Sequence, residues 1–229
     1  MEKFNHIELN NEVTKRGDNG FFRLEKDQEA IAEFLREVDY KTVKFSSEIK
    51  RLRYLVEENY YYNIFDKYIE DEIVECLELA ANYKFEFKSY MAASKFYKDY
   101  ALKTNDKKQY LENYNQHVFI VAMYLADGNV SLAKELMISM LEQRVQPATP
   151  TFLNSGRSRR GELVSCFLLE VGDSLNSINY IDSTAKQLSK IGGGVAINLS
   201  KLRARGESIK GIKGVAKGVI PVAKSLEQG

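Results

Sequence analysis

The pattern of hydrophobic positions changes near residue 145. Before it, apolar residues recur every three to four positions, the spacing of helices that bury one face. Glycine is scarce there, and all three prolines come later. The stripes that predict helices are Ala30, Ile31, Phe34 and Val38; Ile49, Leu52 and Val56; and Ile73, Leu77, Ala80 and Ala81.

Capping residues place further helices in this first region. Ser89 is a candidate N-cap for a helix that buries Ala93 and Phe96. Apolar spacing predicts another helix over 109–126, which the glycine-containing turn at 127–129 ends. Asn129 or Ser131 would cap the helix that follows. The tyrosine run at 60–62 favours packing between helices over base stacking.

After residue 145 the pattern becomes that of alternating strands and helices. Residues 163–171 form a short apolar run typical of a buried strand, 195–199 form a second, and a helix starting at Asp173–Ser174 lies between them. Such a βαβ unit predicts two parallel strands joined by a right-handed crossover. The chain ends within a further helical pattern, and two parallel strands cannot bury both faces, so we expect the sheet to need additional strands.

Composition and charge exclude several classes of protein. The 229 residues are 44% hydrophobic and 28% charged, which argues against collagen-like and disordered chains. The net charge of +1 provides no broad basic field for a nucleic acid. Two cysteines and two histidines make a disulfide framework or a Cys/His zinc site unlikely. A polar N-terminus and the lack of a long apolar run predict a cytoplasmic protein without a membrane partner.

Cys166 is the most informative single residue. Its place in an apolar strand suits either a small buried hydrophobe or a redox thiol that faces a cavity. The second possibility needs a partner cysteine, and Cys76, in a predicted helix, is better interpreted as core filling. Gly192–Gly194 either stops the preceding helix or lets a ligand approach the backbone.

Two polar segments could hold phosphate. The loop that contains Thr149 and runs to Arg157 offers hydroxyls, amides and cations, and it is equally well explained as a structural connection. Residues 201–210 form the strongest local positive cluster, at the end of the sheet where Asp173 would also lie. Asp173 with Arg203 and Lys210 therefore suits a nucleotide, and a solvated charged loop is the alternative.

Four segments carry a family resemblance: SYMAASKFYKDYALKTND, TPTFLNSGRSRRGELVSCFLLEVGDSLNSI, QLSKIGGGVAINLSKLRARGESIKG and GVIPVAKS. Together they resemble the N-terminal third of the large (alpha) chain of aerobic class I ribonucleotide reductases, with the class Ib form most similar. The resemblance implies a truncated ATP-cone-like segment at 1–45, an α-helical domain at 46–150, and at 151–229 the first βαβ part of a ten-stranded α/β barrel, which is incomplete here.

The resemblance also implies roles for individual residues. Cys166 matches one of the two redox thiols, while Thr149, Ser165 and Gly194 match positions that contact the substrate, with Thr149 on the diphosphate side. The residues that match the effector site for deoxynucleoside triphosphates or ATP are Asp173, Ser174, Leu175, Arg203 and Lys210.

In that family a transient thiyl radical abstracts the 3′ hydrogen of a ribonucleoside diphosphate. The paired thiols then protonate the leaving 2′ hydroxyl and supply two electrons, which leaves a disulfide. The implied partners are the rest of the large chain, a small (beta) subunit whose Mn or Fe dimetal centre generates the radical, a second alpha chain, and a thioredoxin- or glutaredoxin-type reductant. No cofactor bound by this chain itself is implied.

The chain lacks the other cysteines and the tyrosines of the family's radical chemistry. We therefore expect it to be inactive alone, as a fragment, a split subunit or the part upstream of an interrupting element. The alternatives are a non-catalytic nucleotide-binding fragment and a helical-repeat interaction module, although no repeat of about 34 residues is evident.

Overall fold

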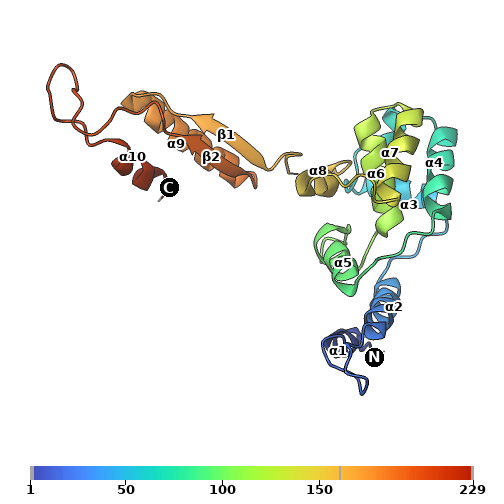
Figure 1. The fold of residues 1–229 in the computed structure, drawn as a ribbon. Helices are drawn as coiled ribbons and strands as arrows, with labels where there is room; N and C mark the ends of the chain where they lie inside the picture. The colour runs from blue at the N-terminus through green and yellow to red at the C-terminus, as the bar shows by residue number, and fades with distance from the viewer. Residues whose placement is uncertain (1–2, 160, 228–229) are drawn as a thin grey trace. The chain divides into compact units, whose positions relative to one another are not determined.

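A computed structural model describes residues 3–159 and 161–227 (Figure 1). The chain divides into two compact units. The helical unit contains the residues up to Pro147 together with Ser155–Arg159, and the barrel unit contains Ala148–Asn154 with the residues from 161 onward. The segment 155–159 therefore belongs to the helical unit, although the residues on both sides of it belong to the barrel unit.

The helical unit consists of helices joined by turns and by longer non-helical segments such as 13–24 and 101–113. Its elements are α1 (His6–Glu12), α2 (Glu25–Tyr40), α3 (Glu48–Glu57), a 3-10 turn (Ile64–Asp66), α4 (Glu70–Asn82), α5 (Tyr90–Lys95) continued by a π-helical turn (Phe96–Tyr100), α6 (Tyr114–Ala126) and α7 (Val130–Leu141). Helices α4, α6 and α7 pack on one another, and α2 packs on α1 and α5. The predicted stripes are confirmed, except that Ala81 is exposed.

Helix α6 is the centre of this unit because it is buried almost all round, from His117 to Met123. It begins at Tyr114, later than predicted, since the residues before it are extended. There Tyr110 exchanges backbone hydrogen bonds with Lys41 and Val43. Asn113 then starts the helix, with its side chain accepting from the Gln116 backbone N–H at 3.0 Å.

The other predicted caps are confirmed. Ser89 Oγ accepts from the Ala92 backbone N–H at 3.2 Å, and Asn129 Oδ1 accepts from the Leu132 backbone N–H at 3.0 Å. Tyr61, in the predicted packing run, is almost completely buried. Cys76 is fully buried on α4, as core filling requires, and burial raises the pKa of its thiol.

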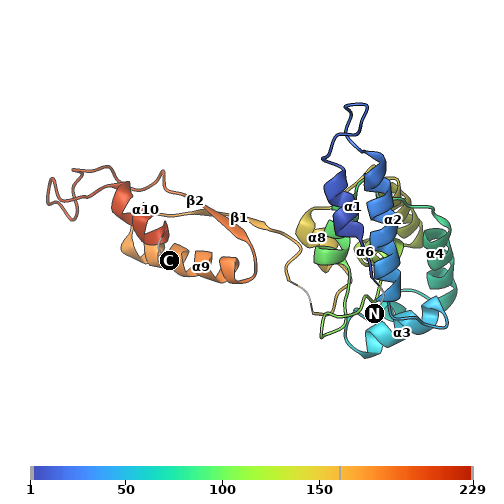
Figure 2. The same ribbon diagram turned by 90° about the horizontal axis from the view of Figure 1, so that it is seen from below.

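The barrel unit contains the predicted βαβ arrangement. Strands β1 (Cys166–Glu170) and β2 (Gly194–Asn198) are parallel, in a register that pairs Cys166 with Gly194 and Glu170 with Asn198. Helix α9 (Leu175–Lys190) connects them and packs against one face of the sheet (Figure 2). The prediction of parallel strands with a helical crossover is therefore confirmed, and so is the final helix, α10 (Val219–Glu227).

Only one face of this sheet is covered. Side chains alternate between half-buried positions beneath α9 and exposed positions opposite. Leu168 is 84% exposed, so the run predicted as a buried strand is covered on one side only in the described residues, as expected for a sheet that needs additional strands. A two-stranded sheet with one uncovered face matches part of a barrel domain, whose other strands would enclose that face.

The segment from Thr149 is helical where the sequence predicted a loop. Helix α8 (Thr149–Asn154) is a short turn of helix with Pro150 as its second residue. Proline is tolerated in the first turn because no backbone N–H is needed there. Thr151 Oγ1 donates to the Leu163 carbonyl at 2.8 Å, and the Asn154 amide donates to the Glu162 carbonyl at 2.8 Å. These bonds tie α8 to the residues that lead into β1.

Two glycines between α9 and β2 are needed for different reasons, one for its backbone conformation and one for close packing. Gly192 has φ +92°, which ends the helix as predicted. A Cβ on Gly193 would lie 2.1 Å from Phe167 Cε2, whereas a Cβ on Gly194 would meet nothing closer than 3.5 Å.

We therefore expect Gly193→Ala to destabilise the barrel unit by about 1–3 kcal/mol, since the aromatic ring cannot move aside without repacking beneath α9. Gly194→Ala is the matched control, and we expect it to unfold at nearly the wild-type urea concentration. Circular dichroism measures the urea concentration at which each variant is half unfolded. Equal midpoints for the two variants would contradict the close packing of Gly193 on Phe167.

Candidate functional site

Three of the predicted substrate-site residues lie together at the start of the sheet. Cys166 is the first residue of β1, and its side chain is on the uncovered face, directly opposite Gly194. Ser165 Oγ lies 3.8 Å from Cys166 Sγ, and the Gly194 backbone N–H donates to the Ser165 carbonyl at 2.7 Å. The interpretation of Cys166 as a buried hydrophobe is therefore wrong for the described residues, because its thiol is accessible.

Glycine at position 194 leaves open space opposite the thiol. Any side chain there would project from the same face as Cys166, since paired residues of adjacent strands point to the same side. Thr149 is the exposed first residue of α8, which is tied to the segment before β1 as described above. The catalytic role of Cys166 and the substrate contacts of Thr149, Ser165 and Gly194 stay predictions.

Four of the predicted effector residues line a single hollow in the barrel unit. This hollow, called the effector hollow below, has a volume of about 370 Å³ and lies where β1 ends and α9 begins. Its predicted members are Asp173, Ser174, Leu175 and Arg203. The rest of its wall is mainly apolar and comes from Ile178, Leu202, Ile209, Val215, Ala216, Lys217, Gly218, Pro221 and Val222.

An ion pair holds the polar side of the effector hollow. Arg203 Nε lies 2.8 Å from Asp173 Oδ2, and its two terminal nitrogens donate to the Ser208 carbonyl at 2.8 Å and to the Asp173 carbonyl at 3.4 Å. Ser174 caps α9 by accepting from the Ser177 backbone N–H at 3.1 Å. The hydrogen bonds of Arg203 thus fix the loop after β2 against the loop after β1.

Lys210 is placed differently from the other predicted effector residues. It has φ +51° and lies in an exposed turn closed by backbone hydrogen bonds between Ile209 and Ile212. Ile209 lines the effector hollow, and Lys210 is not among the residues of its wall. The cation that does line this hollow beside Arg203 is Lys217, which follows the basic cluster at 201–210 and had no predicted role.

Sequence reasoning missed a buried charge network in the helical unit. The carboxylate of Glu112 accepts from Tyr61 Oη, from the Leu102 backbone N–H at 2.7 Å and from Arg157 Nη2 at 2.7 Å. His117 Nδ1 lies 2.9 Å from the same carboxylate and 3.3 Å from Arg157 Nη2. Because an ionised carboxylate only accepts, Nδ1–H is the donor in a hydrogen bond between His117 and Glu112.

These neighbours change the acidity of Glu112. Burial alone would raise its pKa, but Arg157, His117 and the hydrogen bonds that it accepts lower the pKa to about 2. No spacing signal could have revealed this network, since Tyr61 and Arg157 lie far from Glu112 in the chain.

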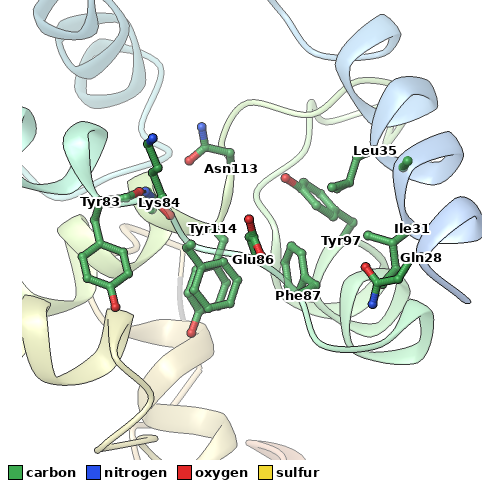
Figure 3. Close-up of a pocket in the computed structure, with 13 residues that line it drawn as sticks. Gln28, Ile31, Leu35, Tyr83, Lys84, Glu86, Phe87, Tyr97, Asn113 and Tyr114 are labelled. Carbon is green, nitrogen blue, oxygen red and sulfur yellow. The ribbon is translucent and has the colours of Figure 1, made fainter. Parts of the chain in front are cut away.

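The helical unit also has a groove between α2 and the extended residues 83–87. It has a volume of about 530 Å³, and Figure 3 shows the side chains that line it, among them Ile31 of α2, Phe87, and Tyr114 at the start of α6. Within the described residues, no group of three or more His, Cys, Asp or Glu side chains is placed to hold a metal ion. None of the described helices combines the length and apolar character that a membrane crossing needs.

Comparison with known families explains both units. Residues 6–85 match the model of the ribonucleotide reductase N-terminal domain, 86–160 match its all-alpha domain, and 164–229 match its barrel domain. The chain belongs to the ribonucleotide reductase family. The helical unit and the barrel unit are thus the family's N-terminal helical part followed by part of its barrel, as the resemblance implied.

Named relatives of the ribonucleotide reductase family agree with this assignment. The chain is 51% identical over 225 residues to ribonucleoside-diphosphate reductase NrdEB subunit alpha of Bacillus subtilis and 51% identical over 223 residues to ribonucleoside-diphosphate reductase subunit alpha of the same organism. It is 42% identical over 224 residues to the subunit alpha of Mycoplasma pneumoniae. These matches cover 97%, 96% and 97% of this chain, and 21%, 32% and 30% of the relatives.

The interpretation of residues 1–45 as a truncated ATP cone stays a prediction. In the structure these residues include α1 and α2, which pack on each other. His6 joins them, with Nε2 2.6 Å from Glu37 Oε2 and Nδ1 2.8 Å from Tyr90 Oη on α5.

Proposed function

We propose that this chain supplies the N-terminal part of a ribonucleoside-diphosphate reductase alpha chain, which converts ribonucleoside diphosphates to deoxyribonucleoside diphosphates for DNA synthesis. The observation that carries this proposal is the accessible thiol of Cys166 on the uncovered sheet face, opposite Gly194 and beside Ser165. Family membership adds that this sheet is part of the barrel domain.

In the proposed reaction Cys166 is one of two thiols that act on the ribose. The 2′ hydroxyl takes a proton from one thiol and leaves as water as the C2′–O bond breaks. The two thiols become a disulfide, and the two electrons that they give up, with the second thiol proton, end in the new C2′–H bond. The proton requires the thiol form of one cysteine. Cys76 is fully buried in the helical core, so the second thiol in this proposal comes from another large-chain segment.

The proposal assigns binding roles to the neighbouring residues. Ser165 would hydrogen-bond the substrate beside the thiol, Gly194 would leave room for the ribose, and Thr149 would contact the diphosphate. The effector hollow would take a deoxynucleoside triphosphate or ATP, with Asp173, Ser174 and Leu175 around the nucleoside. The Asp173–Arg203 ion pair supports this role, because it joins the loops after β1 and β2, so that a bound effector would contact both.

A complementation assay tests this function. We expect the chain, mixed with a complementing large-chain segment and the radical-generating small subunit, to convert CDP to dCDP with a dithiol reductant. Without the complementing segment we expect no dCDP, since the chain spans only 21–32% of its relatives. No dCDP from the complete mixture, with each component folded, would refute the proposal.

The remaining partners follow from the same proposal. They are a second alpha chain, a small subunit with a Mn or Fe dimetal centre, and a thioredoxin- or glutaredoxin-type reductant for the disulfide. The chain's own residues would bind substrate and effector and would carry one redox thiol. The cytoplasmic location expected from the sequence stays a prediction.

A further inference from the structure

Two polar side chains of α8 hold this helix to the segment that leads into β1. Thr151 Oγ1 donates to the Leu163 carbonyl at 2.8 Å, and Asn154 Nδ2 donates to the Glu162 carbonyl at 2.8 Å. The sequence offered this hydroxyl and this amide as possible phosphate ligands, whereas the structure directs them to backbone carbonyls. These two hydrogen bonds, called the α8 clamp below, join residues that are 12 and 8 positions apart in the chain.

The α8 clamp lies between residues that the proposed function places at the substrate. Thr149 is two residues before Thr151 in the same turn of helix, and Ser165 is two residues after Leu163. Ser165 is itself held at the start of the sheet, because its carbonyl accepts from the Gly194 backbone N–H at 2.7 Å. The path from Thr149 to the sheet therefore consists of short ordered stretches of chain and the bonds of the α8 clamp.

Packing around the α8 clamp limits how its side chains can move. A Cβ on Gly161 would lie 3.3 Å from Asn154 Nδ2, which is tighter than an ordinary contact, so glycine there lets the amide reach the neighbouring carbonyl. Phe152, between the two clamp residues, is almost completely buried, and its backbone N–H donates to the Ala148 carbonyl at 2.8 Å. The backbone that carries both clamp residues is thus fixed by its own contacts.

We propose that Thr151 and Asn154 are positioning residues of the substrate site, which set the place of Thr149 relative to Ser165 and Cys166. This inference rests on the proposed function, in which Thr149 contacts the diphosphate and Cys166 acts on the ribose. Both groups belong to one substrate molecule, so its affinity depends on how the protein groups that meet them are spaced. The family resemblance gave neither clamp residue a role.

Loss of either clamp bond is expected to weaken substrate binding more than the chemical step. Without the bond α8 is less well ordered against the segment before β1, and the contact of Thr149 with the diphosphate then includes the entropic cost of ordering it. A contact made equally in the ground state and the transition state changes KM and leaves kcat. In Thr151→Val and Asn154→Leu, which remove the bond at similar side-chain size, we expect KM for CDP to rise about five- to tenfold, with kcat within about twofold of wild type.

The complementation assay, run over a range of CDP concentrations, measures both constants, and three further variants identify the cause. Thr151→Ser keeps the hydroxyl and should have the wild-type KM. Thr184→Val is the matched control, because Thr184 Oγ1 donates to the Tyr180 carbonyl at 2.8 Å within α9, and its KM should stay within about twofold of wild type. In a Thr149→Ala background the effect of Thr151→Val should disappear, since a positioning residue acts only through the residue that it positions.

The outcomes separate this inference from the proposed function. If wild type produces dCDP and both Thr151→Val and Asn154→Leu keep the wild-type KM, the positioning role is wrong and the proposed function stands. The positioning role is also wrong if Thr151→Val raises KM equally with and without Thr149→Ala. If Thr151→Val does not fold, Asn154→Leu, at the exposed bond of the clamp, provides the same comparison. If the wild-type mixture produces no dCDP, both the inference and the proposed function are overturned.

Discussion

Replacing Glu112 with alanine is expected to cost the helical unit about 3–5 kcal/mol of stability, enough to unfold many single domains. The carboxylate is fully buried and accepts from Tyr61, the Leu102 backbone, His117 and Arg157. Its removal leaves the Arg157 charge without its partner, and three further buried donors lose their acceptor. Urea unfolding followed by far-ultraviolet circular dichroism measures the loss.

A second variant keeps the effect measurable if Glu112→Ala does not fold. Glu112→Gln has nearly the same size but no charge, so it separates the ionic contribution from the packing. Glu135→Gln, on the exposed side of α7, is the matched control, and we expect it to change stability by less than about 0.5 kcal/mol.

The pH dependence of stability tests the same carboxylate. Its pKa is about 2 in the folded chain against a usual 4.5, so the folded state favours the ionised form. The resulting stabilisation, roughly 3 kcal/mol, is complete above about pH 5 and is lost as the pH falls toward 2. The stability difference between wild type and Glu112→Gln should shrink over that window. A difference that stays constant from pH 7 to pH 3 would show that Glu112 is not stabilised as an anion.

The features that were predicted correctly depend on residues close together in the chain. Caps such as Ser89 and Asn129 act within three residues, and the βαβ arrangement follows from two short apolar runs around one amphipathic helix. The early start predicted for α6 failed because pairing of Tyr110 with Lys41 and Val43 keeps the preceding residues extended. That pairing brings together residues far apart in the sequence.

Prediction of the candidate site was limited in the same way, to features that depend on residues close together in the chain. Motifs located Cys166, Asp173 and Arg203, because those residues occur in ordered segments of the chain. They could not show that the thiol lies on the face opposite α9, since an apolar strand can be covered on one side or on both. Nor could they show that Lys217 lines the effector hollow, because its position depends on which backbone segments pair after residue 205.

Exchange of Cys166 for serine is expected to abolish reduction in the complementation assay, with a fall of about a thousandfold or more. Serine keeps a hydroxyl of similar size that can still donate a hydrogen bond to the substrate. It cannot form a disulfide, so the two electrons that reduction of the ribose requires are not delivered. Nucleotide binding in the effector hollow should stay at the wild-type level, because Cys166 is not part of its wall.

Thiol titration of the native chain gives an independent test of the same residue. Cys166 is exposed and Cys76 is fully buried, so a thiol reagent should modify one cysteine rapidly in wild type and none in Cys166→Ser. Cys76→Ala is the matched control, with one reactive thiol and full dCDP production. If Cys166→Ser supported wild-type turnover while Cys76→Ala did not, the redox role would belong to the core cysteine and the proposed site would be wrong. If both variants were fully active, neither thiol of this chain would take part in the chemistry.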